Sequence, residues 1–97
     1  MTAQIILEFR AKSNCIEASR DFLRRVLPDT RGYTGCISIV VVQNQDDPAS
    51  FMIVEQWDSR AHYEKYLAWR TESGVMNEFA AMMQGEPSIR FFDYCGV

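Results

Sequence analysis

Four segments of the chain are rich in apolar residues, and in the first of them apolar and polar residues alternate with the period of two that is typical of β-strands. In the first segment Ile5, Leu7 and Phe9 lie on one side, and Glu8 and Arg10 lie on the other. The second and third segments flank a polar stretch of turn-forming residues, which predicts a β-hairpin. The predicted strands are residues 5–10, 36–44, 51–57 and 88–94, and the hairpin loop is residues 44–48.

The interval between the first two strands has the apolar spacing of an amphipathic helix. Asn14, with Glu17 three residues later, resembles a capping box and predicts where this helix begins. Pro28 lacks a backbone N–H and is expected to stop the helix. A turn over residues 31–35 then leads into the second strand.

Two more helices are predicted between the third and fourth strands. Asp58 or Ser59 caps the first, which runs to about Arg70. A short helix over residues 76–83 follows, and Gly85 begins the turn that ends it. Both helices therefore lie between a hairpin and the last strand.

The predicted elements follow the order β-α-β-β-α-β, with a short extra helix before the last strand. This order predicts an α+β fold, the ferredoxin-like sandwich, in which an antiparallel four-stranded sheet carries two helices on one face. A chain of 97 residues is expected to form one domain, residues 1–97. Its content of 47% hydrophobic and 24% charged residues is ordinary for a folded protein.

Both faces of the predicted sheet are apolar. In the third strand Phe51, Ile53 and Trp57 oppose Met52 and Val54. The second strand is expected to place Ile37, Ile39 and Val41 on one face and Cys36, Val40 and Val42 on the other. Two helices cover one face only, and an exposed apolar face favours association. A second copy is the simplest cover, so the pattern predicts a two-fold symmetric homodimer packed sheet against sheet.

The charge pattern excludes several classes of partner. Ten basic and 13 acidic residues give a net charge of −3 without any basic stripe, which argues against nucleic-acid binding. The longest apolar run, residues 79–83, is far shorter than the roughly 20 residues of a membrane-spanning helix. The N-terminal residues lack the features of a signal peptide. We therefore expect a cytoplasmic protein without a membrane partner.

The cysteine and histidine content bears on metal chemistry. Cys15, Cys36 and Cys95 are odd in number and widely spaced, which argues against disulfides and zinc ribbons and predicts reduced thiols. His62 is the sole histidine, so one chain cannot build a multi-histidine metal site, and no metal is expected. Glycine-rich nucleotide-binding motifs and the G-x-S-x-G motif are absent from the sequence.

Aromatic and polar side chains are concentrated in residues 55–70. Helical spacing puts four of them on one face of the predicted helix: Tyr63, Tyr66, Leu67 and Arg70. The adjoining face carries His62, Tyr66 and Trp69. Such a stripe is typical of a core face made of bulky rings. It is also what the wall of an apolar pocket with a few convergent hydroxyls would require.

Four segments together resemble the antibiotic-biosynthesis monooxygenase-like domains, a family that includes quinol monooxygenases. They are the strand 51–57 with its Glu55-x-Trp57 end, the following residues 58–61, the turn 30–36 and the loop 44–48. The resemblance spans roughly residues 4–94. It implies a dimeric α/β barrel of ferredoxin-like subunits that acts without cofactor on quinols, anthrones or polyphenols. In such members the substrate supplies its own electrons to O₂.

The same resemblance implies roles for two residues. Trp57 matches the pocket tryptophan of the family, and Tyr63 falls where one member places a pocket tyrosine. Many members carry a histidine nine residues after that tryptophan, whereas this chain has Tyr66 there and its histidine four residues earlier. Because heme-degrading relatives need that histidine as the iron ligand, the departure argues against heme degradation.

These observations support a hypothesis with assigned residues: a small cofactor-independent monooxygenase that oxidises an electron-rich aromatic molecule with O₂. Tyr66 and Tyr63 are the candidate catalytic hydrogen-bond donors, with Tyr66 first because it replaces the histidine. The candidate substrate-binding residues are Trp57, Trp69, Arg70 and His62. No cofactor is expected.

The alternative is a non-catalytic dimeric domain of the same fold that binds a small molecule or a protein, because fold does not fix function. An enclosed pocket reaching Trp57 and Tyr63 would favour the enzyme. A gap between helix and sheet filled by Phe22, Leu23 and Phe79 would favour the binding domain.

Overall fold

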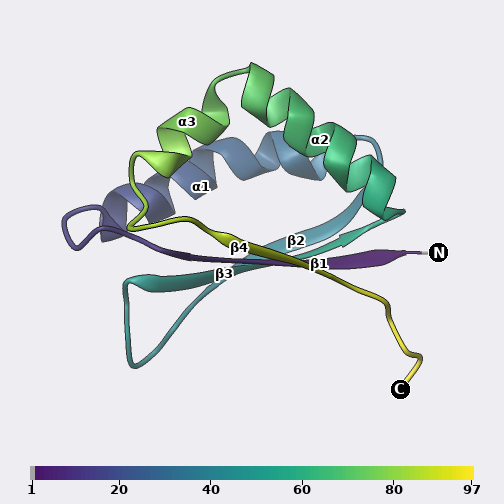
Figure 1. Ribbon diagram of the computed structural model, residues 1–97, viewed down its shortest axis with the longest axis horizontal. Helices are drawn as coiled ribbons and strands as arrows, with labels where there is room; N and C mark the ends of the chain where they lie inside the picture. The colour runs from purple at the N-terminus through teal and green to yellow at the C-terminus, as the bar shows by residue number, and fades with distance from the viewer. Residues whose placement is uncertain (1) are drawn as a thin grey trace.

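A computed structural model describes residues 2–97 (Figure 1). The elements are β1 (Ala3–Arg10), α1 (Ile16–Arg31), β2 (Cys36–Gln43), β3 (Ser50–Trp57), α2 (Arg60–Glu72), α3 (Val75–Ala80) and β4 (Ser88–Phe92). The strands form one antiparallel sheet in the order β2-β3-β1-β4, and the helices cover one of its faces. The predicted α+β ferredoxin-like fold is confirmed. No helix within residues 2–97 combines the length and apolar character needed to cross a membrane.

Helix α1 differs from its prediction at both ends. It begins at Ile16, and the residue before it, Cys15, caps it without a side-chain hydrogen bond, so the capping box at Asn14 is not formed. It continues past Pro28 to Arg31. A proline ring has a φ compatible with a helix, and Pro28 removes only the one hydrogen bond that its own backbone N–H would donate. The last turn is also held from outside, because Thr30 is completely buried against α2.

The inward-facing hydroxyl of Ser19 on α1 is fully buried and has no hydrogen-bond partner within residues 2–97. An unsatisfied buried polar group costs about 1–3 kcal/mol. We therefore expect Ser19→Ala to raise the free energy of unfolding by about 1 kcal/mol or more, measured by urea denaturation.

The neighbouring Ala18 offers a matched control because it is exposed on the same helix. Ala18→Ser measures the difference in helix propensity between the two residue types without any burial. The prediction would be contradicted if Ser19→Ala raised the free energy of unfolding by no more than Ala18→Ser lowers it.

The core lies between the helices and the inner face of the sheet, and its members fall into two groups. The larger group includes Phe9, stacked on Phe51 at 5.0 Å between ring centroids and edge-on to Phe79 at 4.7 Å. The smaller group lies under α2 and consists of Ala3, Ile5, Trp57, Tyr63 and Tyr66. Three of the candidate site residues, Trp57, Tyr63 and Tyr66, thus belong to the smaller group.

Strand β2 contains an irregularity that changes which side chains face inward. Its register against β3 shifts between Cys36 and Ser38. As a result Cys36 packs against the core, while Ile37 is 48% exposed. The expected placement of Ile37 on the same face as Ile39 is therefore wrong, because an extra residue in a strand reverses the alternation beyond it.

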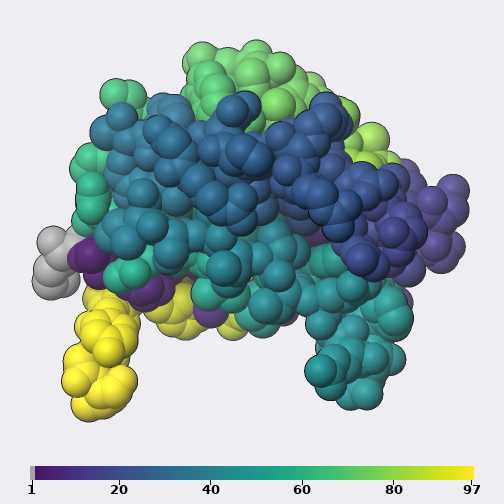
Figure 2. Space-filling view, turned by 180° about the vertical axis from the view of Figure 1, so that it is seen from behind, coloured from purple at the N-terminus to yellow at the C-terminus, as the bar shows by residue number. Residues whose placement is uncertain are grey.

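The outer face of the sheet is uncovered by any helix within residues 2–97 (Figure 1). Val40, Val54 and Ile6 are register neighbours across three strands of this face. Val40 is 53% exposed and Val42 is 48% exposed. The β2–β3 loop (teal) and the C-terminal tail (yellow) project beyond the sheet on this side, at opposite ends (Figure 2). The apolar outer face thus lies between two projections.

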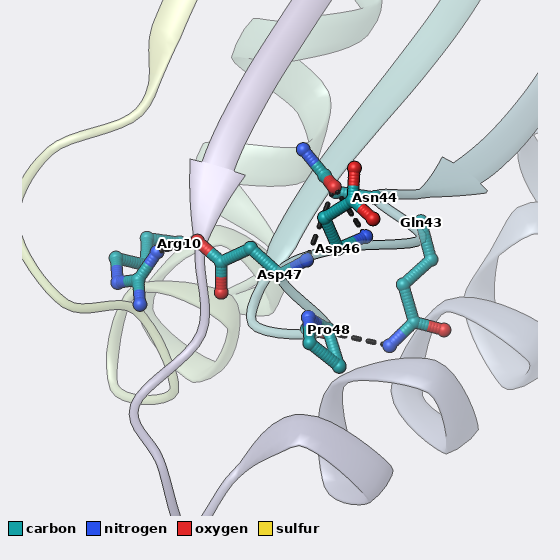
Figure 3. Close-up of polar contacts among 6 residues, drawn as sticks. All are labelled: Arg10, Gln43, Asn44, Asp46, Asp47 and Pro48. Carbon is teal, nitrogen blue, oxygen red and sulfur yellow. Dashed lines mark hydrogen bonds and ion pairs between the residues drawn. The ribbon is translucent and has the colours of Figure 1, made fainter.

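The β2–β3 loop forms the predicted hairpin connection and is tied internally (Figure 3). Asn44 Oδ1 accepts hydrogen bonds from the backbone N–H groups of Asp46, at 2.8 Å, and Asp47, at 3.1 Å. This is an Asx turn, which explains why an asparagine begins the loop. The Asp47 carboxylate pairs with Arg10 at the end of β1, so the projection is anchored to the sheet.

Candidate functional site

A cavity of about 40 Å³ lies between α2 and the inner face of the sheet. Apolar side chains from α1, α3 and three strands form most of its wall. Four of its lining residues carry polar groups: Glu55, Tyr63, Tyr66 and Arg70. Because one water needs about 10–15 Å³ of such space, the cavity has room for about two or three waters. The gap is therefore narrow but contains a concentrated set of polar groups.

Helix α2 brings three of these groups into the cavity. It starts at Ser59, whose Oγ accepts a hydrogen bond from the backbone N–H of His62 at 3.1 Å. Tyr63, Tyr66 and Arg70 then follow at i, i+3 and i+7, and all three are buried. The predicted shared face is thus confirmed, and it faces the sheet.

Arg70 holds the end of this helix against the last turn of α1. Its Nε donates to the Tyr66 hydroxyl at 3.0 Å, and its Nη2 donates to Thr30 Oγ1 at 2.8 Å and to the Val26 carbonyl at 2.6 Å. The hydroxyls of Tyr66 and Thr30 lie 2.6 Å apart. These bonds close a small network across the two helices.

The charge of Arg70 has no acidic partner. The residue is only 4% exposed, and no ion pair within residues 2–97 includes it. The C-terminal end of α1 carries a partial negative charge that favours a nearby guanidinium. The site therefore contains a buried positive charge that an anion in the cavity would complement.

Both tyrosines remain protonated at neutral pH. Burial raises the pKa of Tyr63, and the charge of Glu55 and the neighbouring Tyr66 act in the same direction. Burial also raises the pKa of Tyr66, although hydrogen bonds with Thr30 and Arg70 oppose the shift. The two phenols can therefore serve as neutral hydrogen-bond donors.

The hydroxyls of Tyr63 and Tyr66 differ in their hydrogen bonds to other residues. The Tyr66 hydroxyl is in contact with both Thr30 and Arg70. The Tyr63 hydroxyl forms no hydrogen bond within residues 2–97. Within the same residues, Ser19 Oγ is the only side-chain oxygen or nitrogen that is both inaccessible and without a hydrogen bond. The unbonded Tyr63 hydroxyl is therefore accessible. The Tyr63 hydroxyl is thus the freer donor.

Glu55 is a site residue that the sequence analysis did not assign. It lies on the inner face of β3 between Ile39 of β2 and Ile5 of β1, and it is only 4% exposed. Its Oε1 accepts a hydrogen bond from Trp57 Nε1 at 3.0 Å. Burial raises its pKa from 4.5 to about 7, and the bond from Trp57 opposes part of this shift. The sequence did contain a signal: an acidic residue in phase with the inward-facing Ile53 and Trp57.

The structure does not bring the two tryptophans together across the cavity. Trp57 is completely buried, with its ring centroid 4.9 Å from that of Tyr66 and 5.7 Å from that of Tyr63. Its indole packs against both tyrosine rings and does not line the cavity. Trp69 is 38% exposed, stacks on Tyr33 at 5.2 Å and does not line the cavity.

His62 lies apart from this group, in a shallow surface depression with Thr34, Ala61 and Lys65. Its Nδ1 is 2.6 Å from Ser59 Oγ, and its ring packs on Gly35. Gly35 has a φ of +95°, and a Cβ there would lie 2.6 Å from His62 Cδ2. His62 is therefore part of the packing between the helix start and the preceding turn. Within residues 2–97 no three His, Cys, Asp or Glu side chains cluster as metal ligands would.

Several solved structures of other proteins are similar to the structure of this chain. One similar crystal structure is an antibiotic biosynthesis monooxygenase, with a TM-score of 0.85, 20% identity, and coverage of 95% of this chain and 97% of the other. Another is SnoaB, a cofactor-independent oxygenase from Streptomyces nogalater, with a TM-score of 0.84, 11% identity, and coverage of 97% and 93%. Rv0793 from Mycobacterium tuberculosis has a TM-score of 0.85, 15% identity, and coverage of 97% and 95%.

Because all three sequence identities are low, these structural similarities establish the fold alone. Among curated proteins nothing matches the chain. The sequence model of the family described as antibiotic biosynthesis monooxygenase matches residues 3–82. That match covers the strands β1, β2 and β3, all three helices and the four polar residues that line the cavity. The chain therefore belongs to the antibiotic biosynthesis monooxygenase family.

Proposed function

We propose that the protein is a cofactor-independent monooxygenase that oxidises a quinol, an anthrone or a polyphenol with O₂. The observation that carries this proposal is the convergence of Glu55, Tyr63, Tyr66 and Arg70 on one apolar cavity beneath α2. Hydrogen-bond donors and a positive charge in a dry site stabilise a substrate oxyanion. The similarity to SnoaB, itself a cofactor-independent oxygenase, supports the same chemistry.

The reaction balances without an external reductant. For an anthrone, the methylene carbon loses two hydrogens and gains one oxygen atom to become a carbonyl. The second oxygen atom leaves with those two hydrogens as water. All electrons come from the substrate, so the role of the protein is to bind, to stabilise the anion and to exclude bulk water.

An aromatic substrate needs more room than this small cavity offers, since small-molecule sites are typically about 300–1,000 Å³. A groove of about 340 Å³ runs between α1 and β2, and Leu23 and Leu27 line both this groove and the cavity. We propose that the substrate reaches the cavity through this groove when the two leucine side chains change rotamer. Arg20 and Arg31 at the groove would favour an electron-rich or anionic molecule.

The second candidate is a non-catalytic dimeric domain that binds a small molecule or a protein. The small cavity favours it, because Phe22, Leu23 and Phe79 fill much of the space between helices and sheet. Heme degradation is less well supported than either, because His62 lies outside the cavity.

Oxygen uptake with a dihydroxynaphthalene or an anthrone, in buffer containing a metal chelator, tests the proposed function. We expect consumption of O₂ well above the buffer rate, with one quinone formed per O₂ consumed. A rate equal to that of buffer for every such substrate would contradict the proposal and leave the binding domain.

We also propose that the working unit is a homodimer packed through the outer face of the sheet. This face exposes Val40, Val42 and Val54, and the two projections beside it define a shape that a second copy can match. An interface of ordinary obligate size would bury on the order of 2,000 Å². Self-association would cover the apolar area that the helices leave open.

Light scattering after size exclusion should therefore give about twice the chain mass of 11.2 kDa at micromolar protein. Val54→Lys, at the centre of the face, should shift the protein to the monomer, because an unpaired charge would be buried. Gln84→Lys adds the same charge at an exposed position elsewhere and should leave the dimer intact. A wild-type monomer would contradict this proposal.

A further inference from the structure

Glu55 combines three features that a purely structural carboxylate does not need. It is buried, it lies among apolar neighbours on the inner face of the sheet, and within residues 2–97 it forms no ion pair. Burying an unpaired carboxylate is costly. A protein that needed only packing at this position could use an aliphatic side chain, as it does at the neighbouring Ile53.

The two oxygens of Glu55 have different surroundings. Oε1 is held by the indole N–H of Trp57, which fixes the carboxyl group in one orientation. Oε2 accepts no hydrogen bond within residues 2–97. It is nevertheless not an inaccessible atom, since Ser19 Oγ is the only inaccessible side-chain oxygen or nitrogen without a hydrogen bond in those residues. Oε2 is therefore accessible, and it belongs to a side chain that lines the cavity. One oxygen is thus anchored and the other is available.

The groups that share the cavity match the needs of a developing phenolate. The Tyr63 hydroxyl is available as a neutral donor, and Arg70 supplies a buried positive charge on the same helix. Donors and charges placed where an anion forms lower the barrier to its formation. The remaining requirement is a base that removes the proton.

We propose that Glu55 is the proton acceptor for a neutral, hydroxylated aromatic substrate bound in the cavity. The O–H bond of the substrate breaks, an O–H bond forms at Oε2, and the electron pair stays on the substrate oxygen. The resulting phenolate is the electron-rich species that reacts with O₂. This inference rests on the proposed function and assigns its substrate class: a phenol or enol that arrives protonated.

The acid–base properties of the site agree with this role. The pKa of Glu55, raised to about 7 by burial, lets the carboxylate take and return a proton near neutral pH. The titratable groups close enough to interact with its charge are Tyr63 and Tyr66 of α2 and Cys36 of β2, and Arg70 of α2 lines the same cavity. Burial and the charge of Glu55 raise the pKa of Cys36 and of both tyrosines, so all three remain protonated.

The dependence of kcat/KM on pH, from about pH 5 to about pH 9, tests the inference. For the wild type we expect kcat/KM to rise with pH to a plateau, with an apparent pKa near 7. Glu55→Gln should lower the plateau by ~100-fold and remove the rising limb, since a general base contributes about 10²–10⁴. Glu64→Gln removes an exposed carboxylate from α2 and should match the wild type.

Rescue separates direct proton transfer from a positioning role. Glu55→Ala opens space for a small carboxylate, and added formate should restore at least a tenth of the lost rate. Formate should have no effect on Glu55→Gln, whose amide fills the position. If Glu55→Gln does not fold, the pH profile of the wild type and the formate response of Glu55→Ala still decide the question.

The outcomes distinguish the two proposals. If the wild type oxidises the substrate while Glu55→Gln keeps the same rate and pH profile, or formate fails to restore Glu55→Ala, Glu55 is not the base and the proposed function stands. If the wild type oxidises no substrate, the proposed function is wrong and the assignment of Glu55 falls with it.

Discussion

Tyr63→Phe is expected to lower the kcat for quinol or anthrone oxidation by ~100-fold, with KM nearly unchanged. The variant loses only the hydroxyl of Tyr63, a cavity-lining residue whose hydroxyl is accessible and forms no hydrogen bond within residues 2–97. A donor that acts mainly on the developing anion contributes to kcat more than to binding. Since this hydroxyl has no hydrogen-bond partner within residues 2–97, the free energy of unfolding should change little.

Tyr66→Phe is the informative comparison. We expect it to lower turnover at least tenfold and also to destabilise the fold by about 1–3 kcal/mol, because Thr30 and Arg70 lose a buried partner. Oxygen uptake and urea denaturation together separate the two effects. His62→Ala is the control, since His62 packs on Gly35 outside the cavity and its loss should leave turnover within a few-fold. Full activity in both phenylalanine variants with an inactive His62→Ala would overturn this assignment.

The second large effect concerns stability as a function of pH. The pKa of Glu55 is about 7 in the folded protein and 4.5 when the group is unperturbed, so between these values the folded state binds the extra proton. The stability that comes with this proton is complete below about pH 4.5 and is lost as the pH rises through about 7. At 1.36 kcal/mol per pKa unit, we expect the free energy of unfolding to fall by about 2.5 kcal/mol between about pH 5 and about pH 8.5.

Urea denaturation at a single protein concentration, repeated across this pH range, measures the decrease. Glu55→Gln cannot ionise at this position, so its stability should vary much less with pH and should exceed that of the wild type at the alkaline end. Equal slopes for the two proteins would show that Glu55 is not the group responsible.

The sequence predicts most of the fold, because the alternation of side chains and the turn residues agree with the tertiary structure. The hairpin connection over residues 44–48 and the cap at Ser59 both form. Predictions based on one local signal were less reliable. Pro28 does not end α1, since Thr30 is held by partners on α2, more than 30 residues further along the chain. The shift in β2 at Cys36 is equally invisible in the pattern of apolar residues.

The candidate site was predictable in part for a related reason. Helical spacing places Tyr63, Tyr66 and Arg70 on one face, and the structure confirms that they lie together. The Glu55-x-Trp57 strand end does not by itself assign a chemical role to Glu55, because that role depends on the burial of its carboxyl group. The outward position of Trp69 depends on its stacking with Tyr33, a contact between distant segments that spacing cannot reveal.

The hydrogen bond between Trp57 and Glu55 has a practical consequence. The indole of Trp57 is completely buried and donates directly to the carboxyl group, so its fluorescence must respond to the charge on that group. Trp69, the other tryptophan, is partly exposed, and iodide can quench its emission selectively. The chain thus carries an intrinsic optical reporter that follows the proton on Glu55 in the unlabelled protein, whether or not a substrate is known.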